Sequence, residues 1–150
     1  MKKMEEDKKI YILDTSALLT YIEDEEGSDD VEKLLIKAEK GDVEIYIVFI
    51  SLTEIFYITI QEKDEPEALE RIKLIQSLSV KFVESYEDLN LKAGKLKAGN
   101  RISLADSYIA ALCQEFKGIL VHKDPEFEKI SPSINDYRLP YKSPGTNVQP

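Results

Sequence analysis

The stretch YILDTSALL, residues 11–19, decides how the rest of the chain is interpreted. An apolar run over residues 10–13 stops at a single acid, Asp14, two hydroxyl residues follow, and the apolar residues then resume. This pattern predicts a short buried strand over residues 10–13 and a helix over residues 15–23. A carboxylate at the end of a buried strand either caps the next helix or holds a ligand, and the remaining motifs must distinguish the two.

Strand and helix patterns alternate along the chain. Apolar runs rich in β-branched and aromatic residues predict further strands over residues 43–50, 80–83 and 119–122. Helical periodicity predicts helices over residues 29–40, 52–63, 66–78, 86–98 and 103–116. Ser28 is the expected N-cap of the helix over residues 29–40. This alternation favours an α/β fold with a central parallel sheet between two layers of helices, an α/β/α sandwich.

The chain has 150 residues, which suits one domain with a sizeable core. We expect that domain over residues 1–130, followed over residues 131–150 by an edge strand or extended arm and a disordered end, because prolines are frequent there. No apolar run approaches the roughly 20 residues that span a bilayer. The charged start MKKMEEDKK has no apolar signal-peptide segment, so we expect a cytoplasmic protein. The one cysteine, Cys113, lies in an apolar segment and is expected to pack in the core.

The net charge of −9 argues against binding to DNA or to an acidic membrane through a broad basic surface. A nucleic-acid substrate is still compatible with it, because a cation can neutralise acids that are concentrated in one site. The segment LKAGKLKAGNR supplies Lys92, Lys95, Lys97 and Arg101 for contact with substrate phosphates. A solvated helix face explains the same charges equally well.

Four acids fall near the carboxyl ends of predicted strands, where open parallel sheets bind their ligands: Asp14, Glu54, Asp106 and Asp124. Each acid taken alone is more simply explained as a helix cap. Ser51 and Glu54 have the spacing of a capping box, and Ser103 and Asp106 repeat that spacing with Asp in place of Glu. Asp124 precedes a proline, which is typical of an N-cap.

The four acids taken together favour a metal site. Carboxylates that converge on one edge of a sheet repel one another unless a cation lies between them. Hard oxygen ligands suit Mg²⁺ or Mn²⁺, and there is no Cys/His cluster to suggest zinc. In this interpretation Asp14 is held at a rigid strand end so that it reaches a metal ion, and Ser16 orients a water or a neighbouring ligand.

In chain order, the segments ILDTSALL, SLTEIF, ISLADSYIAA and LVHKDPEF resemble the PIN domain, especially the toxin members of VapBC pairs. The resemblance extends over about residues 10–130 and implies a PIN-like sandwich and a Mg²⁺- or Mn²⁺-dependent ribonuclease. It implies an RNA substrate, a homodimer and an antitoxin protein as partners. Carried over by position, the metal-binding and catalytic acids are Asp14, Glu54, Asp106 and Asp124, with Ser16 as the polar residue after the first acid.

One position departs from the pattern of this family. Many members carry Thr or Ser two residues before the last acid, where this chain has His122. The histidine either supplies the same polar contact or only ends its strand. Glu126 is a fifth acid near the predicted site, for which an exposed position at a helix start is the simpler interpretation.

Other functions fit the same acids less well. A receiver domain needs a second acid beside Asp14 and an Asp after the third strand, and a haloacid-dehalogenase-type phosphatase needs an acid at Ser16. Two alternatives stay open: a PIN-like scaffold that acts by protein contacts without catalysis, and an RNA-processing nuclease that is not a toxin.

The segment EIFYITI, residues 54–60, is apolar on more than one helical face. Such a helix is either buried by a third layer of its own domain or covered by a partner. We expect a homodimer through this helix, with Leu35 and Ile36 extending the same surface.

Overall fold

The computed structural model describes residues 8–141 of the chain. Its strands are β1 Lys9–Leu13, β2 Val43–Val48, β3 Lys81–Val83, β4 Ile119–His122 and β5 Asn135–Arg138. Its α-helices are α1 Thr15–Ile22, α2 Ser28–Glu39, α3 Phe49–Glu62, α4 Glu65–Gln76, α5 Glu87–Gly99 and α6 Leu104–Phe116. A short 3-10 helix, η2, covers Pro125–Lys129. Every strand before β5 is followed by at least one helix, as crossover connections between parallel strands require.

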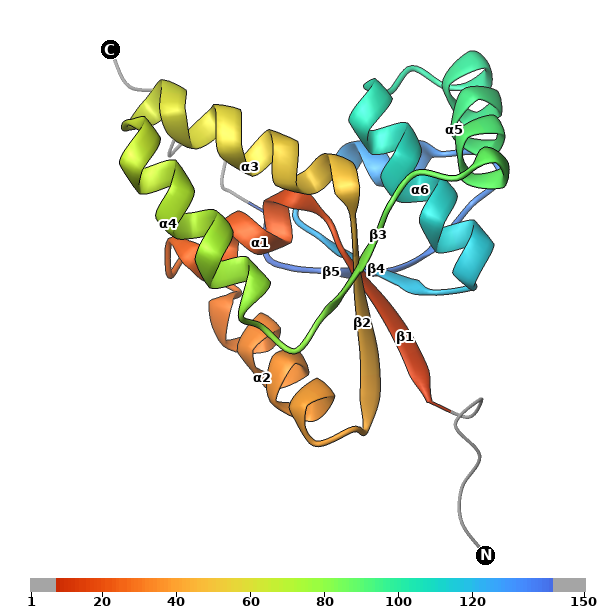
Figure 1. The fold of residues 1–150 in the computed structure, drawn as a ribbon. Coiled ribbons are helices and arrows are strands. Elements are labelled where there is room, and N and C mark those ends of the chain that lie inside the picture. Colours follow the sequence, from red (N-terminus) through yellow and green to blue (C-terminus); the bar gives the residue numbers. More distant parts are fainter. Residues whose placement is uncertain (1–7, 142–150) are drawn as a thin grey trace, which may run out of the picture.

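The strands form one sheet in the order β3-β2-β1-β4-β5, and every neighbouring pair is parallel. Helices α1 to α4 cover one face of the sheet, and α5 and α6 cover the other (Figure 1). Along the central strand, Ile12 packs toward α5 and α6, whereas Tyr11 and Leu13 pack toward the opposite helices. This alternation divides the core into two halves and confirms the predicted three-layer sandwich.

The predicted boundary between the second strand and the next helix is wrong. The strand ends at Val48 and α3 begins at Phe49, because the first helical turn packs its apolar side chains against the α6 side of the core. Ser51 therefore lies inside the helix, fully buried, and does not cap it. The capping-box interpretation of Ser51 and Glu54 is wrong for the same reason.

The predicted N-cap of α2 is also wrong. Ser28 is the first residue of the helix, and Gly27 precedes it in a left-handed conformation with φ of 102° and no side-chain cap. A β-carbon at this glycine would lie 3.2 Å from Cδ of Pro140. The other predicted helices and strands end within two residues of those in the structure.

Gly118 brings the chain close to β1 after α6. Lys117, with φ of 51°, makes the left-handed turn that ends the helix, so the glycine is not needed for that turn. A β-carbon at Gly118 would lie 2.8 Å from Cδ1 of Ile12 and 3.2 Å from Cγ2 of Ile10. The glycine therefore lets β4 start directly beside β1.

One edge of the sheet is formed by β5, which pairs with β4 so that His122 lies opposite Arg138. Cys113, on α6, is buried in the core, as expected, and burial raises the pKa of its thiol. No helix in the described part of the chain is long and apolar enough to cross a membrane. The expected disordered end and most of the charged start concern residues 142–150 and 1–7, which lie outside the described residues.

Candidate active site

Asp14 is held rigidly at the carboxyl end of β1. Its carboxylate caps α1, because the backbone N–H of Ala17 donates to its Oδ1 at 2.7 Å. The hydroxyl of Ser16 donates to both carboxylate oxygens, at 2.7 and 2.8 Å. Asp14 is only 3% exposed, and burial raises its pKa to about 8 against the opposing effect of these donors, with Asp106 and Asp124 raising it further. The capping interpretation of Asp14 is confirmed. The negative charges of two acids that are far from it in the sequence, Asp106 and Asp124, also act on its carboxylate.

Asp106 lies in the first turn of α6. Ser103 caps this helix, since its hydroxyl accepts a hydrogen bond from the N–H of Asp106 at 3.0 Å. Burial raises the pKa of Asp106 to about 7, and the charges of Asp124, Glu54 and Glu126 add to the shift. Helix α6 therefore places a carboxylate where several other acids repel its charge.

Asp124 and Glu126 approach Asp106 from the turn after β4. Oδ1 of Asp124 accepts from the N–H of Glu126 at 3.0 Å, which caps η2 and confirms the predicted cap. One oxygen from each of Asp106, Asp124 and Glu126 lies within 4.8 Å of the other two. Glu126 is exposed at a helix start, as the sequence suggested, but the tight 3-10 turn also brings it into this three-acid cluster.

Glu54 reaches the site from α3. Its Oε1 accepts a hydrogen bond of 2.5 Å from the hydroxyl of Thr15, at the start of α1. No pattern in the sequence indicates this contact, because it joins residues from two helices that only the folded sheet brings together. Glu54 and Asp14 lie outside the three-acid cluster, although each interacts electrostatically with Asp106.

The donor set at this edge of the sheet suits a hard divalent cation. Within residues 8–141, no Lys or Arg forms an ion pair with Asp14, Glu54, Asp106, Asp124 or Glu126. The oxygens of the three-acid cluster are close enough together to share one ion. Carboxylates that repel one another without a basic partner are the ligands that Mg²⁺ and Mn²⁺ prefer. The residues therefore fit such an ion.

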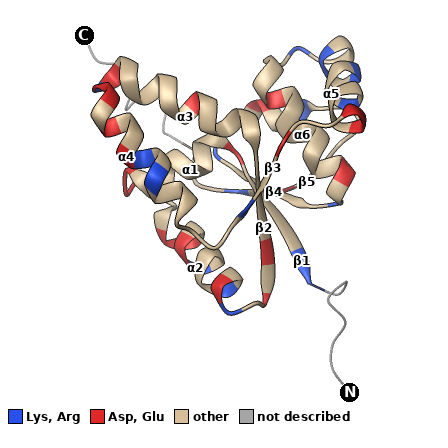
Figure 2. Cartoon of the chain, viewed as in Figure 1, with Lys and Arg blue, Asp and Glu red and all other residues tan. Residues whose placement is uncertain are grey.

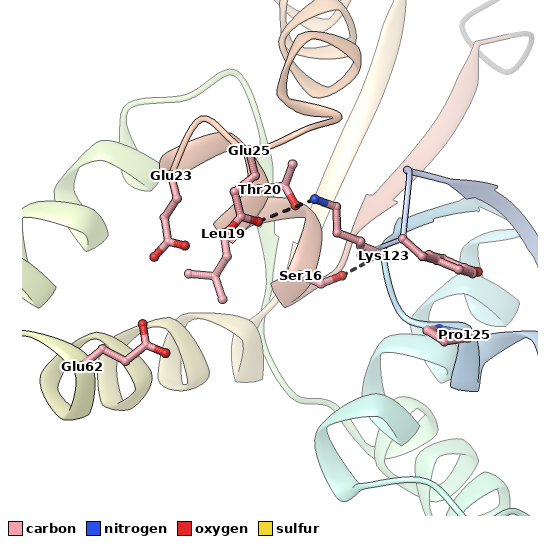
Figure 3. Close-up of a pocket in the computed structure, with 9 residues that line it drawn as sticks. Ser16, Leu19, Thr20, Glu23, Glu25, Glu62, Lys123 and Pro125 are labelled. Carbon is pink, nitrogen blue, oxygen red and sulfur yellow. Dashed lines mark hydrogen bonds and ion pairs between the residues drawn. The ribbon is translucent and has the colours of Figure 1, made fainter. Parts of the chain in front are cut away.

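Ser16 also joins the acids to a neighbouring cavity. Its hydroxyl oxygen accepts from the backbone N–H of Lys123 at 2.9 Å, which ties α1 to the turn after β4 (Figure 3). The cavity has a volume of about 320 Å³, and Figure 3 shows Ser16 and Lys123 among the residues that line it. The Lys123 side chain is 6% exposed, and its Nζ lies 3.6 Å from Oε1 of Glu25. The serine thus holds both Asp14 and the strand end that carries Asp124.

Most of the basic segment lies in α5, whose lysines are drawn in blue in Figure 2. Lys92 pairs with Glu115 of α6 at 3.6 Å, and Nζ of Lys97 donates to the carbonyl of Ile102 at 2.7 Å. Both side chains therefore fasten α5 to its surroundings. Lys95 is exposed. Arg101 is exposed and lines a cavity of about 230 Å³ together with Glu126 and Lys129.

His122 is fully buried, and both of its ring nitrogens are within hydrogen-bond distance of other groups. Nδ1 accepts from the backbone N–H of Asp124, and Nε2 faces a carboxylate oxygen of Asp136. The ring thus contacts the backbone of the last acid.

Solved structures of low sequence identity share this fold. VapBC2 from Rickettsia felis, solved bound to a DNA fragment from its promoter, is 20% identical with a TM-score of 0.71, over 87% of this chain and 99% of that one. DNA-bound VapBC from Salmonella typhimurium is 18% identical with a TM-score of 0.69, over 87% and 98%. VapC20 from Mycobacterium tuberculosis, a toxin that cleaves the sarcin-ricin loop, is 13% identical with a TM-score of 0.57, over 77% and 90%.

A comparison with curated proteins found no match. A family model for the PIN domain matches residues 11–131, which include all five acids and His122. The match covers most of the chain and agrees with the parallel sheet, its helical layers and the acids at its carboxyl edge. The chain therefore belongs to the PIN domain family.

Proposed function

We propose that this chain is a divalent-metal-dependent endoribonuclease that hydrolyses RNA phosphodiester bonds. The observation that carries the proposal is the three-acid cluster, in which Asp106, Asp124 and Glu126 bring carboxylate oxygens within 4.8 Å of one another. Its place in a PIN-domain chain supports it. So does the raised pKa of Asp106, about 7, since carboxylates crowded at one site favour a cation between them.

In this proposal the acids divide into two groups. Asp106 and Asp124 hold the cation with Glu126, and Asp14 and Glu54 complete the negative site directly or through water. Mg²⁺ or Mn²⁺ bound there would activate a water and neutralise charge on the phosphodiester.

Hydroxyl groups position the acids that complete this site. The hydroxyl of Ser16 keeps Asp14 in place, and that of Thr15 does the same for Glu54. Because these acids are anchored before any ligand arrives, little reorganisation is needed when a cation binds.

Contact with the RNA backbone requires cations outside the acidic site. Arg101 and Lys129 both line a cavity with Glu126, and we propose that Arg101 contacts a phosphate beside the cleaved bond, because its guanidinium group can bind a phosphate through two hydrogen bonds. Lys95 is exposed on α5 and adds a weaker contact. Lys92 and Lys97 contribute mainly to the electrostatic field, because their ammonium groups already bind Glu115 and the carbonyl of Ile102.

Cleavage of RNA by the purified chain tests this function. We expect cleavage in Mn²⁺ and none in excess EDTA. A water nucleophile forms no cyclic phosphate, and we expect the 3′-oxygen to be the leaving group, as in other PIN-domain nucleases, so that the products carry 5′-phosphate and 3′-hydroxyl ends. Cyclic-phosphate ends would indicate a contaminating nuclease of another mechanism. A chain that binds Mn²⁺ and cuts no RNA would favour a non-catalytic scaffold and contradict the proposal.

We further propose that the chain is the toxin of a toxin–antitoxin pair. The support is the fold shared with VapBC proteins and with a toxin that cleaves the sarcin-ricin loop. A short neighbouring reading frame that encodes a DNA-binding protein, and an inhibitory complex between the two products, would be expected. Cleavage of one precursor RNA without growth arrest would favour a processing nuclease instead.

We propose that the protein forms a homodimer through α3 and the helices beside it. Tyr57 is 45% exposed and Ile60 37% exposed on α3, and Leu69 and Leu74 are exposed on the adjoining α4. The expectation for Leu35 is wrong, because this side chain is buried in the core; Ile36 is exposed as expected.

We expect light scattering at micromolar concentration to give a dimer mass. Tyr57→Glu should give a folded monomer, because a two-fold interface pairs the same patch from both subunits and would bring two new negative charges into the apolar contact. Leu91→Glu, at an exposed apolar position on α5, is the matched control and should leave the mass unchanged. A monomer mass for the parent protein would contradict the proposed dimer.

A further inference from the structure

His122 is the single histidine of the chain and ends β4, two residues before Asp124. Its side chain is completely buried and packs edge-on against the ring of Phe127, with 5.2 Å between ring centroids. A buried imidazole must satisfy its polar atoms within the protein. Which partners it has therefore determines which ring nitrogen carries a proton.

Asp136 determines that choice. Its Oδ2 lies 2.9 Å from Nε2 of His122 and also accepts from Nε of Arg138 at 2.9 Å. Burial alone would raise the pKa of Asp136, but the hydrogen bonds from His122 and Arg138 outweigh it and lower the pKa. The carboxylate is therefore charged and can only accept. Nε2 must then carry a proton, and Nδ1 is the acceptor, because the backbone N–H of Asp124 points at it.

The free nitrogen holds the backbone of the acidic site. Nδ1 of His122 accepts from the N–H of Asp124 at 3.0 Å. The carboxylate of Asp124 in turn accepts from the N–H of Glu126 at 3.0 Å. Both ends of Asp124 are thus constrained, and the turn that carries it is linked through the histidine to Asp136 on β5.

We propose that His122, oriented by Asp136, is a positioning residue that fixes the turn at Asp124 and so keeps the carboxylates of Asp124 and Glu126 beside Asp106 for a divalent cation. The proposal rests on the proposed function, because it assigns a role within the same acidic site. Groups that orient metal ligands typically change metal affinity by about 10- to 100-fold when they are removed.

Two substitutions at one position separate positioning from packing. In His122→Asn the amide oxygen is attached to Cγ, as Nδ1 is, so it can still accept from the N–H of Asp124. In His122→Gln the terminal amide reaches toward Asp136, as Nε2 does, and the acceptor for Asp124 is lost. We expect His122→Gln to weaken Mn²⁺ binding by about 10- to 100-fold, and His122→Asn to weaken it much less.

Calorimetry with Mn²⁺ alone measures the metal affinity of the parent protein and of each variant. RNA cleavage at saturating Mn²⁺ shows whether the acidic site is still active once the metal is bound. An equal loss of affinity in both variants, or a larger loss in His122→Asn, would assign the histidine a packing role and overturn the proposal. Parent affinity in His122→Gln would overturn it as well, while leaving the proposed function intact. A parent protein that neither binds Mn²⁺ nor cleaves RNA would overturn the proposed function and this proposal together.

Nitrogen NMR of the single imidazole gives a readout that depends on neither variant folding. In the metal-free parent protein we expect Nε2 to carry the proton and Nδ1 to be unprotonated. Two ring N–H groups, or a proton on Nδ1 alone, would exclude the bond from Asp124 and overturn the proposal even if His122→Gln does not fold.

Discussion

Asp14→Asn should abolish metal-dependent RNA cleavage and leave the protein folded. The amide oxygen of asparagine can still accept from the N–H of Ala17, so α1 keeps its cap. The negative charge that helps to bind the cation is lost. Since removing groups that only orient metal ligands costs about 10- to 100-fold, we expect removal of a charged site residue to cost more than about 100-fold in cleavage rate.

The stability of the same variant tests whether the charge of Asp14 is unfavourable in the metal-free protein, as a metal site implies. Burial and the charges of Asp106 and Asp124 raise the pKa of Asp14 to about 8, so the ionised carboxylate is unfavourable in the metal-free protein. Asp14→Asn should therefore melt at the parent temperature or above it without metal.

Asp64→Asn is the matched control, because Asp64 caps α4 through the N–H of Glu67, on the surface. It should cleave RNA at the parent rate. If Asp14→Asn also cleaved at the parent rate, the acidic site would be wrongly assigned. A clearly lower melting temperature of Asp14→Asn without metal would show that the charge of Asp14 stabilises the metal-free fold, which would contradict an acid held there for a cation.

Divalent metal should stabilise the fold, increasingly so as the pH rises. Burial is the main cause that raises the pKa of Asp14 to about 8 and that of Asp106 to about 7, from an ordinary value of 3.8. Between these limits the native state binds more protons than the unfolded chain, so the free energy of unfolding falls as the pH rises from about 4 to about 8. Below this range both states are protonated, and the two acids contribute no further change.

A cation competes with those protons, because carboxylates bind metal in the deprotonated form. Mn²⁺ should therefore restore the stability lost at higher pH, by about 2.7 kcal/mol at one hundred times its Kd. Thermal melts across this pH range, with Mn²⁺ and then with EDTA, measure the effect. In Asp14→Asn, the fall in metal-free stability with pH should be smaller. Melting temperatures that do not respond to Mn²⁺ at any pH would count against a preformed site.

The fold could be predicted because its periodic signals are local. The apolar run before Asp14 and the helical spacing after it are consecutive in the chain, and alternation of the two patterns implies parallel strands. The boundary at Val48 could not be predicted, because Phe49 continues the apolar run while its backbone is already helical. An apolar run alone does not say where a strand becomes a helix.

Part of the candidate site could also be predicted from the sequence, and part of it could not. Asp106 and Asp124 could be placed at one edge because strand ends in a parallel sheet share that edge. The contact between Thr15 and Glu54 joins two helices, and that between His122 and Asp136 depends on the register of β5 beside β4. Such contacts have no signature in a single sequence.

Parallel measurement of bound Mn²⁺ and of RNA cleavage tests the central claim most directly. Metal-free protein is titrated with Mn²⁺, and the bound ion is counted by electron paramagnetic resonance in the samples whose cleavage rates are recorded. We expect the cleavage rate to rise in proportion to occupancy in the parent protein, and both to fall in Asp106→Asn. Full cleavage by protein that holds no Mn²⁺ in excess EDTA, or full occupancy without cleavage, would contradict a metal-dependent ribonuclease.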